Sequence, residues 1–545
     1  MPIKYVDKFE SGSEYLYIKD SFRPFIINVE DNTRAGTAIN NAIAEGTQNG
    51  YKSFFLVSKD ELLYVDTPIS LASDINIDFN NNILKTVNSG NVGINPIRVL
   101  NLFELSNVII NNLKIEGLYN EITTVSDTKD IYNNMIYIEN CTNVRFLHTD
   151  ISKFDSNVFY SEDRVDNSYS GTGTERWCCI VALYSDKVVF DDISISNSSK
   201  EGITLSYCTN STINKLDMMN CDRSWTPISL FNCDRIEITN SKIKKTITGS
   251  VINFFTSNSI IDNCYIESTH EDSTGLDIGH EIDEAQNYTN NVVSNSVLKC
   301  LISSLKSSEK QLSNDIAFIG NNIINPTASK YLIKTPNGLV KFISNTLTSE
   351  NSWCFHLANF SSLNLHIDNN IITATNVLRT ALRENDNIKV YTNGNRCTAS
   401  SFIYLGDYAN VTDASRLSLT ANNDIISGVL MDGALAQVYD LSQEVHNLSF
   451  NGCSSVGTPT GRMPMTLRLS NNLFTNRINL PRATTLIMYG NVFTNASLAS
   501  MVNLNGGTNS ILEGVISNNT VRGTLTDVVN GSSGFTDNTK KNNNA

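Results

Sequence analysis

Charged and aromatic side chains gather in four short stretches, 174–177, 200–201, 222–225 and 270–277, in a chain of which only 18% of residues are charged. Six carboxyl groups lie in these stretches, on Glu175, Glu201, Asp222, Glu271, Asp272 and Asp277. Hydrolysis of a glycosidic bond needs two carboxyl groups, about 5–5.5 Å apart for retention or about 6.5–9.5 Å for inversion. The residue types therefore predict acid–base chemistry on a sugar.

We favour Glu201 with Asp222 as that pair, one as a protonated general acid and the other as a base or nucleophile. Asp277, Glu175 and Asp272 are the alternatives. Indole rings stack on the apolar faces of sugars, and charged groups hold hydroxyls or acidic substituents. On that basis the predicted substrate-binding residues are Trp177, Trp225, Arg176, Arg223, Lys200 and His270.

Two other interpretations stay open. A polysaccharide lyase would need a base beside a uronate carboxylate, for which Lys200, Arg223 and His280 are candidates. A charged corner can also be no more than a solvated face, on a protein that only binds sugar or serves as a structural tail fibre. The acidic stretch 275–286 contains oxygen donors and a His that could hold a divalent ion, but its spacing matches no known metal loop and a plain acidic turn is expected.

A repeat of about 24 residues positions these stretches. When the segments that begin at 135, 179, 202, 227, 251 and 275 are aligned, their apolar residues coincide. The first column consists of Ile136, Ile180, Ile203, Ile228, Ile252 and Leu276. The second consists of Ala182, Leu205, Leu230, Phe254 and Ile278. Apolar and polar residues alternate within each segment, as in a half-buried strand, so Val181, Thr204, Ser229, Asn253 and Asp277 should point outward.

Short strands at this period, bounded by Asn, Ser or Gly, predict an all-β fold: a single-stranded, right-handed parallel β-helix of about 19 coils. About one residue in eight is Asn, far more than an ordinary domain needs. Asn tolerates the left-handed conformation and bonds to its neighbour's backbone, so we expect it in ladders at the corners of the coils. Cys141, Cys208 and Cys233 share another column and are expected to be a buried stack of thiols.

The N-terminal part differs from the repeat. Residues 31–46 place Ala38, Ile39, Ala42 and Ile43 on one face of a predicted helix that stops at Gly46 and caps the first coil. The predicted divisions are a head or attachment segment (1–30), the capping helix with the first strands (31–66), the β-helix (67–533) and a disordered tail (534–545). A loop at 152–178 interrupts the β-helix and leads into the charged stretches, where function tends to lie.

Composition excludes several classes. The net charge is −14 and the hydrophobic share is 40%, so neither a nucleic-acid partner nor a disordered chain is expected. No apolar run approaches the roughly 18 residues of a membrane helix, and the first residues contain no apolar stretch of the signal-peptide type. The 11 Cys form no CxxC pair, which argues against zinc, and no metal or cofactor is expected.

The helix DNTRAGTAINNAIAEG, followed by the strands of TPISLASDINIDFNNNILK, resembles the start of the pectate-lyase-like β-helix superfamily, and its bacteriophage tailspike branch in particular. The segment EYLYIKDSF (14–22) resembles N-terminal parts of phage tail and baseplate proteins. The resemblance implies a homotrimer in the virion, attached to the phage tail or baseplate through its N-terminus, that binds and often cleaves a bacterial surface polysaccharide such as capsule or O-antigen. It also implies synthesis in the host cytoplasm without a signal peptide.

Overall fold

The fold was analysed in a computed structural model. The structure describes the chain from residue 23 to residue 530 with internal gaps. The described ranges are 23–87, 98–117, 134–153, 178–197, 201–219, 226–245, 250–268, 274–278, 287–303, 314–325, 331–334, 337–358, 362–381, 387–405, 416–433, 446–455, 465–480, 484–495, 497–504 and 511–530. Contacts divide the chain into two compact units, Met1–Asn197 and Ser198–Ala545, which are treated separately below.

The first unit begins with a helix and then repeats short strands. Its elements are β1 (Phe25–Val29), η1 (Asn32–Arg34), α1 (Ala35–Gln48), β2 (Ser53–Ser58), β3 (Leu62–Val65), β4 (Ile69–Ser70), β5 (Asn76–Asp78), β6 (Ile83–Thr86), β7 (Leu100–Phe103), β8 (Ser106–Glu116), β9 (Ile136–Glu139), β10 (Thr142–Ser152), β11 (Cys178–Leu183) and β12 (Asp186–Ser196). Strands of successive coils pair in parallel, as in β8–β10, β10–β12, β7–β9 and β9–β11.

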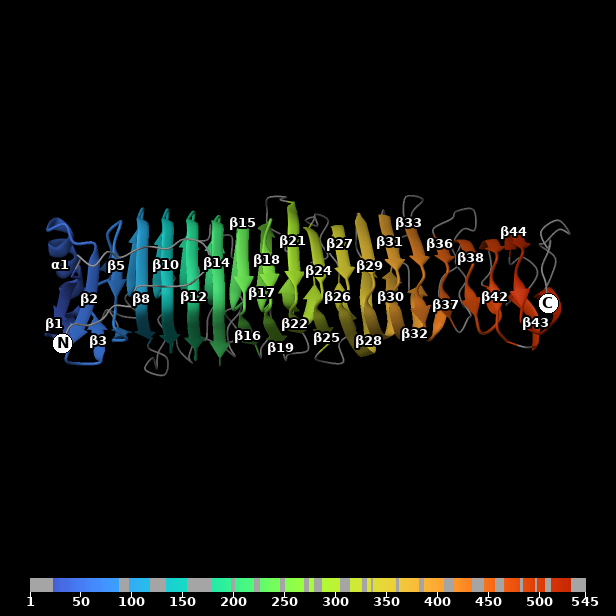
Figure 1. Ribbon diagram of the computed structural model, residues 1–545, viewed down its shortest axis with the longest axis horizontal. Coiled ribbons are helices and arrows are strands. Elements are labelled where there is room, and N and C mark those ends of the chain that lie inside the picture. The colour runs from blue at the N-terminus through green and yellow to red at the C-terminus, as the bar shows by residue number, and fades with distance from the viewer. Residues whose placement is uncertain are drawn as a thin grey trace, which may run out of the picture. The chain divides into compact units, whose positions relative to one another are not determined.

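The predicted capping helix is present and packs on the first coils, at the N-terminal end in Figure 1. Asp31 caps η1, the short 3-10 helix that leads into α1, because its carboxylate accepts from the backbone N–H of Thr33 at 2.9 Å. Ile39 and Ile43 are buried, as expected of the inner face. The helix does not stop at Gly46 as predicted, but continues to Gln48. Gly46 is required for a different reason: a Cβ there would lie 2.4 Å from the Phe54 ring.

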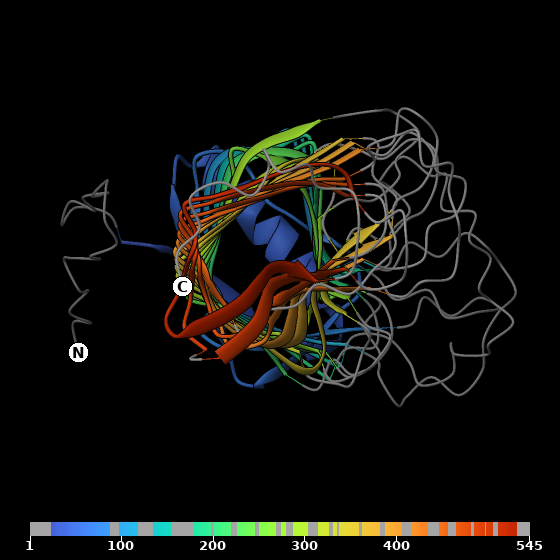
Figure 2. The same cartoon turned by 90° about the vertical axis from the view of Figure 1, so that its right-hand side faces the viewer.

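In the second unit strands of successive coils pair in three parallel series, called here the first, second and third sheets, and Figure 2 shows the ring of strands along the stack. The first sheet contains the beginning of β14 (Thr209–Met219), the end of β15 (Ile228–Thr239), β18 (Ile260–Asp262), β21 (Tyr288–Ser294), β24 (Asn314–Ile319), β27 (Gly338–Ile343), β29 (Leu363–Asp368), β31 (Asn387–Asn393), β33 (Arg416–Asn422), β36 (His446–Asn451), β38 (Met465–Ser470), β41 (Thr484–Tyr489) and β44 (Ile511–Ser517). The second sheet contains the end of β14, β16 (Lys242–Lys245), β19 (Tyr265–Ser268), β22 (Val297–Lys299), β25 (Asn322–Ile324), the beginnings of β28 (Thr346–Ala358), β30 (Ile371–Ala381) and β32 (Arg396–Leu405), then β34 (Ile425–Ile426), β37 (Ser454–Ser455), β39 (Leu473–Phe474), β42 (Val492–Phe493) and β45 (Thr520–Val521).

The third sheet positions the candidate site. It contains β13 (Glu201–Ser206), the beginning of β15, β17 (Ile252–Ser257), β20 (Thr274–Asp277), β23 (Leu301–Ser303), β26 (Tyr331–Lys334), the ends of β28, β30 and β32, and β35 (Val429–Gly433). Near the C-terminal end, β40 (Ile478–Leu480), β43 (Ser497–Leu504) and β46 (Thr524–Asn530) form a separate parallel sheet.

The predicted apolar columns are confirmed within each unit. Ile136 pairs with Ile180 in the first unit, and Ile203, Ile228, Ile252 and Leu276 pair in succession in the second. All of them are fully buried. Since a shift of one residue would turn every apolar side chain to the outside, this core fixes the register of the coils.

The Asn excess forms ladders at the corners, as predicted. In the second unit, side chains of Asn321, Asn345, Asn370 and Asn395 stack inside the corner between the first and second sheets, at most 2% exposed. The backbone N–H of Asn345 donates to Oδ1 of Asn370 at 2.8 Å, and the N–H of Asn370 donates to Oδ1 of Asn395 at 2.9 Å. Each rung therefore binds the next by the polar groups that the turn would otherwise leave unpaired.

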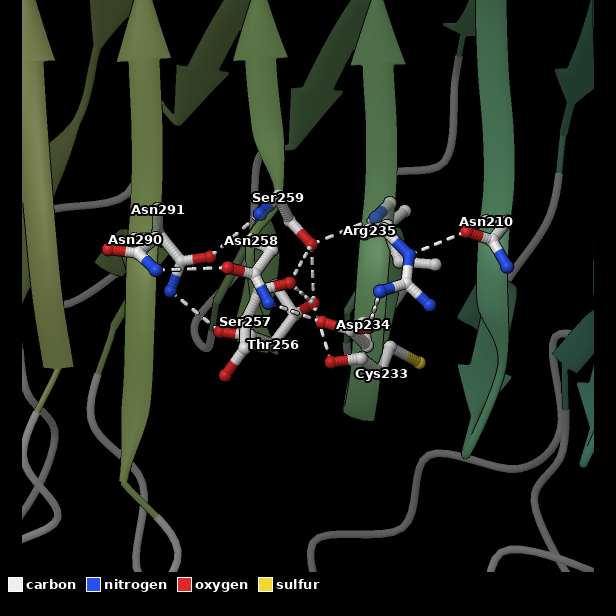
Figure 3. Close-up of polar contacts among 11 residues, drawn as sticks. Asn210, Cys233, Asp234, Arg235, Thr256, Ser257, Asn258, Ser259, Asn290 and Asn291 are labelled. Atoms are coloured by element: carbon white, nitrogen blue, oxygen red, sulfur yellow. Dashed lines mark hydrogen bonds and ion pairs between the residues drawn. The ribbon is translucent and has the colours of Figure 1, made fainter.

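A second set of corner residues adopts the left-handed conformation. Arg235, Asn258 and Asn290 have φ values of 55°, 53° and 56° at the start of the first sheet. Figure 3 shows their ladder: Asn290 donates to Asn258 at 3.0 Å, Asn258 donates to Asp234 at 2.6 Å, and Arg235 donates to Asn210 at 2.6 Å. The tolerance of Asn for positive φ thus explains its frequency at these positions.

Candidate functional site

The outer face of the third sheet in the second unit carries a column of polar residues, which register places one per coil. Pairing runs from Thr204 through Ser229, Asn253, Asp277, Ser303, Lys334, His356, Arg379 and Tyr404 to Asp432. From Thr204 to Tyr404 the residue that precedes each of them lies in the buried apolar column, so alternation turns this column outward. Successive members are about 4.8 Å apart along the stack.

Asp277 is the predicted catalytic residue whose side chain the structure describes. It ends β20 between Asn253 and Ser303 of the neighbouring coils and is 1% exposed. The expected register of Thr204, Ser229, Asn253 and Asp277 is confirmed, but solvent exposure is not. Thr204 and Ser229 are fully buried, and so is Val181 in the first unit. Thr204, Ser229 and Asp277 are therefore outward in register but shielded from solvent, whereas Asn253 and Lys334 are partly exposed.

Glu201 is the first residue of β13 rather than part of the corner before it. Through the paired isoleucines it is level with Thr226, Ser250 and Thr274 of the next coils. It therefore lies three coils, about 14 Å along the stack, from the coil of Asp277. This separation of the two backbone positions is larger than the roughly 9.5 Å upper distance between the paired carboxyl groups of a glycosidase.

The other predicted site residues lie outside the described residues. They are Glu175, Asp222 and Asp272 among the carboxyl groups, and Arg176, Trp177, Lys200, Arg223, Trp225 and His270 among the substrate-binding residues. The pairing of Glu201 with Asp222 stays a prediction. His280, Glu281, Asp283 and Glu284 of the acidic stretch also lie outside the described residues.

A cluster of aromatic and basic residues lies farther along the stack, and His356, Arg379 and Tyr404 of the outer column belong to it. Trp353 and His356 of β28 have ring centroids 5.4 Å apart, and Tyr331 of β26 lies 5.4 Å from His356. The guanidinium of Arg379 lies 3.2 Å from the centre of the Trp353 ring and 5.3 Å from that of Tyr404. The planar cation is therefore held between rings of the preceding and following coils.

Lys334 completes this cluster. It pairs with His356, which pairs with Arg379, so three basic side chains follow one another in successive coils. All three are partly buried, which strengthens their electrostatic interactions relative to bulk water. We call Tyr331, Lys334, Trp353, His356, Arg379 and Tyr404 the Trp353 cluster.

Sequence reasoning missed the Trp353 cluster because the coil length changes after residue 286. The paired residues Ile333, Phe355, Leu378 and Ile403 are separated by unequal steps, and a register shift lies between Ser349 and Trp353. When the sequence is aligned at a fixed period of about 24 residues, these paired positions no longer coincide. A usable signal was present, since Trp353 is one of only three Trp in the chain.

A fully buried lysine borders the predicted corner. The Nζ atom of Lys245, the last residue of β16, donates to the backbone oxygen of Ser250 at 3.0 Å. Lysine is among the residues least often fully buried. It was not singled out in the sequence analysis.

A second polar group lies on the outer face of the first sheet. His366 of β29 stacks on Tyr391 of β31 with ring centroids 4.9 Å apart. Partial burial lowers the pKa of His366, and nearby Lys341 lowers it further against the opposing effect of Asp368. Partial burial also raises the pKa of Asp368. Both directions favour the uncharged forms, and no member of this group lies on the third sheet.

The cysteines behave as predicted from the sequence. Cys141, Cys208 and Cys233 are buried thiols. Burial raises the pKa of Cys233 well above its usual value and that of Cys264 to about 11, so these thiols are held protonated and unreactive. Within the described ranges, no group of three or more His, Cys, Asp or Glu is placed to hold a metal ion.

No family model and no curated protein matches this chain. Solved structures do match. The tailspike of E. coli bacteriophage HK620, solved with a hexasaccharide, is 10% identical, with 92% of this chain and 75% of that chain covered and a TM-score of 0.37. The catalytic domain of a GH87 α-1,3-glucanase, solved with nigerose, is 12% identical, with 81% and 70% covered and a TM-score of 0.39. An exopolygalacturonase from Thermotoga maritima is 11% identical, with 78% and 91% covered and a TM-score of 0.33.

These are the kinds of protein that the sequence resembles, a phage tailspike and β-helix enzymes that act on polysaccharides. Identities of 10–12% with TM-scores below 0.5 carry no information on the substrate or the reaction of this chain. The parallel β-helix itself rests on the strand pairing described above. In the described part of the chain, no helix has the length and apolar character needed to cross a membrane.

Proposed function

We propose that this protein is a tailspike-type depolymerase that binds a bacterial surface polysaccharide, capsule or O-antigen, on the outer face of the third sheet and hydrolyses it. The observation that carries the proposal is that Asp277, a buried carboxyl group, lies in the same outer column as Lys334, His356, Arg379 and Tyr404 of the Trp353 cluster. Flat rings beside cations are suited to pyranose faces and their polar substituents. A row with one residue per coil suits a polymer, because it offers contacts along its length.

Hydrolysis in this proposal uses Asp277 as one of two carboxyl groups. Its partner comes from the segments that lead into the third sheet, where Asp222 and Asp272 are the candidates. One group protonates the leaving oxygen and the other activates water or attacks the anomeric carbon. The pair predicted from the sequence, Glu201 with Asp222, is the alternative within the same proposal.

A second candidate reaction is elimination by a polysaccharide lyase, which Lys334, His356, Arg379 and Tyr404 favour. In this reaction a base removes the proton next to a uronate carboxylate, and a cation neutralises that carboxylate. The Trp353 cluster contains both kinds of group within the stacking distances given above. The two reactions differ in their products, because only elimination leaves an unsaturated sugar that absorbs in the ultraviolet.

The test is incubation of the protein with a panel of capsular polysaccharides and O-antigens, followed by size analysis and ultraviolet absorbance of the products. We expect a shortened polymer without new absorbance, and loss of at least 100-fold in rate for Asp277→Asn. Glu237→Gln is the control, since Glu237 is exposed on the first sheet. Full activity of Asp277→Asn would refute its role, and new absorbance would replace hydrolysis by elimination. Binding without shortening would indicate a receptor-binding tail protein.

The assembly belongs to the same proposal. A tailspike would be a homotrimer in the virion, attached to the tail or baseplate through residues 1–30, and would act outside the cell. Light scattering of the purified full chain measures the oligomeric state, and a monomer at micromolar concentration would contradict the trimer. A pull-down with and without residues 1–30 tests the attachment.

A further inference from the structure

We infer that the Trp353 cluster is a subsite for an acidic sugar, so that the polysaccharide bound by this protein carries carboxylate groups. This inference rests on the proposed function, because it assigns the substrate class of the same outer face. It goes further in predicting which chemical group is recognised, by which residue, and with what dependence on salt.

The first argument is charge. Lys334, His356 and Arg379 follow one another in adjacent coils, with about 4.8 Å between successive positions. The chain as a whole carries a net charge of −14. In the same outer column, Asp277 lies two coils before Lys334 and Asp432 lies two coils after Arg379. The basic row attracts anions, and the net negative charge of the rest of the protein disfavours the binding of acidic polymers elsewhere on the surface.

The second argument is the orientation of Arg379. Its guanidinium lies 3.2 Å from the centre of the Trp353 ring and is flanked by Tyr404 at 5.3 Å. Stacking fixes the plane of the guanidinium, and a planar guanidinium held in this way is pre-organised for bidentate hydrogen bonds to a carboxylate. A lysine at this position could not be held in the same way, because its ammonium group is not planar and does not stack on a ring.

The third argument is that aromatic rings lie beside the basic side chains. His356 contacts both Trp353 and Tyr331 at 5.4 Å, so aromatic faces flank the cations on more than one coil. A sugar acid has an apolar ring face and a carboxylate at one edge. The Trp353 cluster offers a surface for the first and a donor pair for the second within a few ångströms, whereas a free inorganic anion would use only the cations.

The test uses two acidic polymers, polygalacturonate and a glucuronate-containing polymer (heparosan), each with its carboxyl-reduced neutral form, titrated into the full chain. We expect both acidic polymers to bind more tightly than their reduced forms by at least tenfold, with affinity that falls as salt is added. Arg379→Gln should weaken acidic binding by about tenfold to hundredfold, while leaving binding of the neutral forms unchanged. Arg379→Lys should recover only part of the loss.

The control is Arg396→Gln, since Arg396 is exposed on the second-sheet part of the same strand, β32; it should bind like the wild type. Equal binding of acidic and reduced polymers, unchanged binding by Arg379→Gln at an unchanged melting temperature, or no binding of either acidic polymer would overturn the inference. Cleavage of a neutral polysaccharide by both wild type and Arg379→Gln would overturn it while leaving the proposed function intact. Tighter binding of the acidic polymers without cleavage of any polysaccharide in the panel would support the inference and contradict the proposed hydrolysis.

Discussion

The interior Asn ladder makes a sharp prediction for Asn370→Ala. The side chain of Asn370 is 1% exposed. Its Oδ1 accepts from the backbone N–H and from Nδ2 of Asn345, at 2.8 and 3.0 Å. Its Nδ2 donates to the backbone oxygen of Phe342 at 2.9 Å and to Oδ1 of Asn395 at 3.0 Å. Alanine removes all of these bonds in one step and leaves no polar atom in their place.

The magnitude follows from the groups left behind. The substitution deprives the two donors of Asn345 of their shared acceptor inside the corner, and each buried group without a partner costs about 1–3 kcal/mol. We therefore expect a loss of about 3–5 kcal/mol in the free energy of unfolding, after allowance for non-additivity. A loss of that size is comparable to the stability of many whole domains, about 5–15 kcal/mol.

The assay is chemical denaturation followed by circular dichroism, with hydrogen exchange at the neighbouring rungs as a local readout. Asn369→Gly is the matched control. Asn369 is exposed with φ of 56°, and glycine already occupies the corresponding place at Gly394 with φ of 68°. We expect this control to change stability by less than about 0.5 kcal/mol. A wild-type denaturation midpoint for Asn370→Ala, or an equal loss in both variants, would refute the ladder as a source of stability.

Three further predictions concern the interior. Burial raises the pKa of Asp424, so its contribution to stability is present at low pH and is lost as pH rises through the raised value; Asp424→Asn should raise the melting temperature at neutral pH but not near pH 3, and the reverse would contradict the assignment. Gly46→Ala should destabilise α1 by about 1–3 kcal/mol, because the new methyl group would overlap Phe54; an unchanged melting temperature would show that Phe54 yields freely. Cys233 should resist iodoacetamide at pH 8 until the protein unfolds, and rapid labelling found by mass spectrometry would disprove its burial.

The architecture could be predicted because the repeat of apolar residues in the sequence reflects the stacking of their side chains in the core. The spacing of Ile203, Ile228, Ile252 and Leu276 shows which residues stack, and the structure pairs them in that order. The chemical nature of Asn likewise indicated corner ladders before any geometry was known. The helix end was harder, because a glycine can mark either a stop or a close contact, and Gly46 is the second kind.

The site was less accessible to sequence reasoning. The alternation rule places Asp277 on the outer face but does not say what packs over it, and the structure buries it. Distances across coils depend on register, which separates Glu201 from Asp277 by three coils. The Trp353 cluster depends on a register shift inside β28, a local irregularity that no periodic pattern contains.

Asp424 shows how closely the interior couples one rung to another. It occupies a ladder position that Asn fills in the preceding rungs, and its Oδ1 accepts from the backbone and side-chain nitrogens of Asn395 at 2.8 Å. In the other rungs the Nδ2 of the Asn donates to a backbone oxygen of the preceding coil. A carboxylate has no such N–H donor. Thr392 supplies the missing proton by donating from its hydroxyl to Oδ2 at 2.6 Å, at a position that is apolar in the two preceding coils, where Phe342 and Ile367 stand.

This coupling between rungs is confined to the interior residues, which stabilise the stack, and does not restrict the outer residues, which are available for recognition. Interior positions must agree with their neighbours above and below, so a change such as Asn to Asp is accommodated only with a matching change one coil away. Outer positions such as Lys334, His356 and Arg379 inherit their spacing from that interior without having to maintain it. The outer column is therefore free to vary in chemistry while its geometry is held fixed, which is why a recognition surface on this fold can be built from single residues on successive coils.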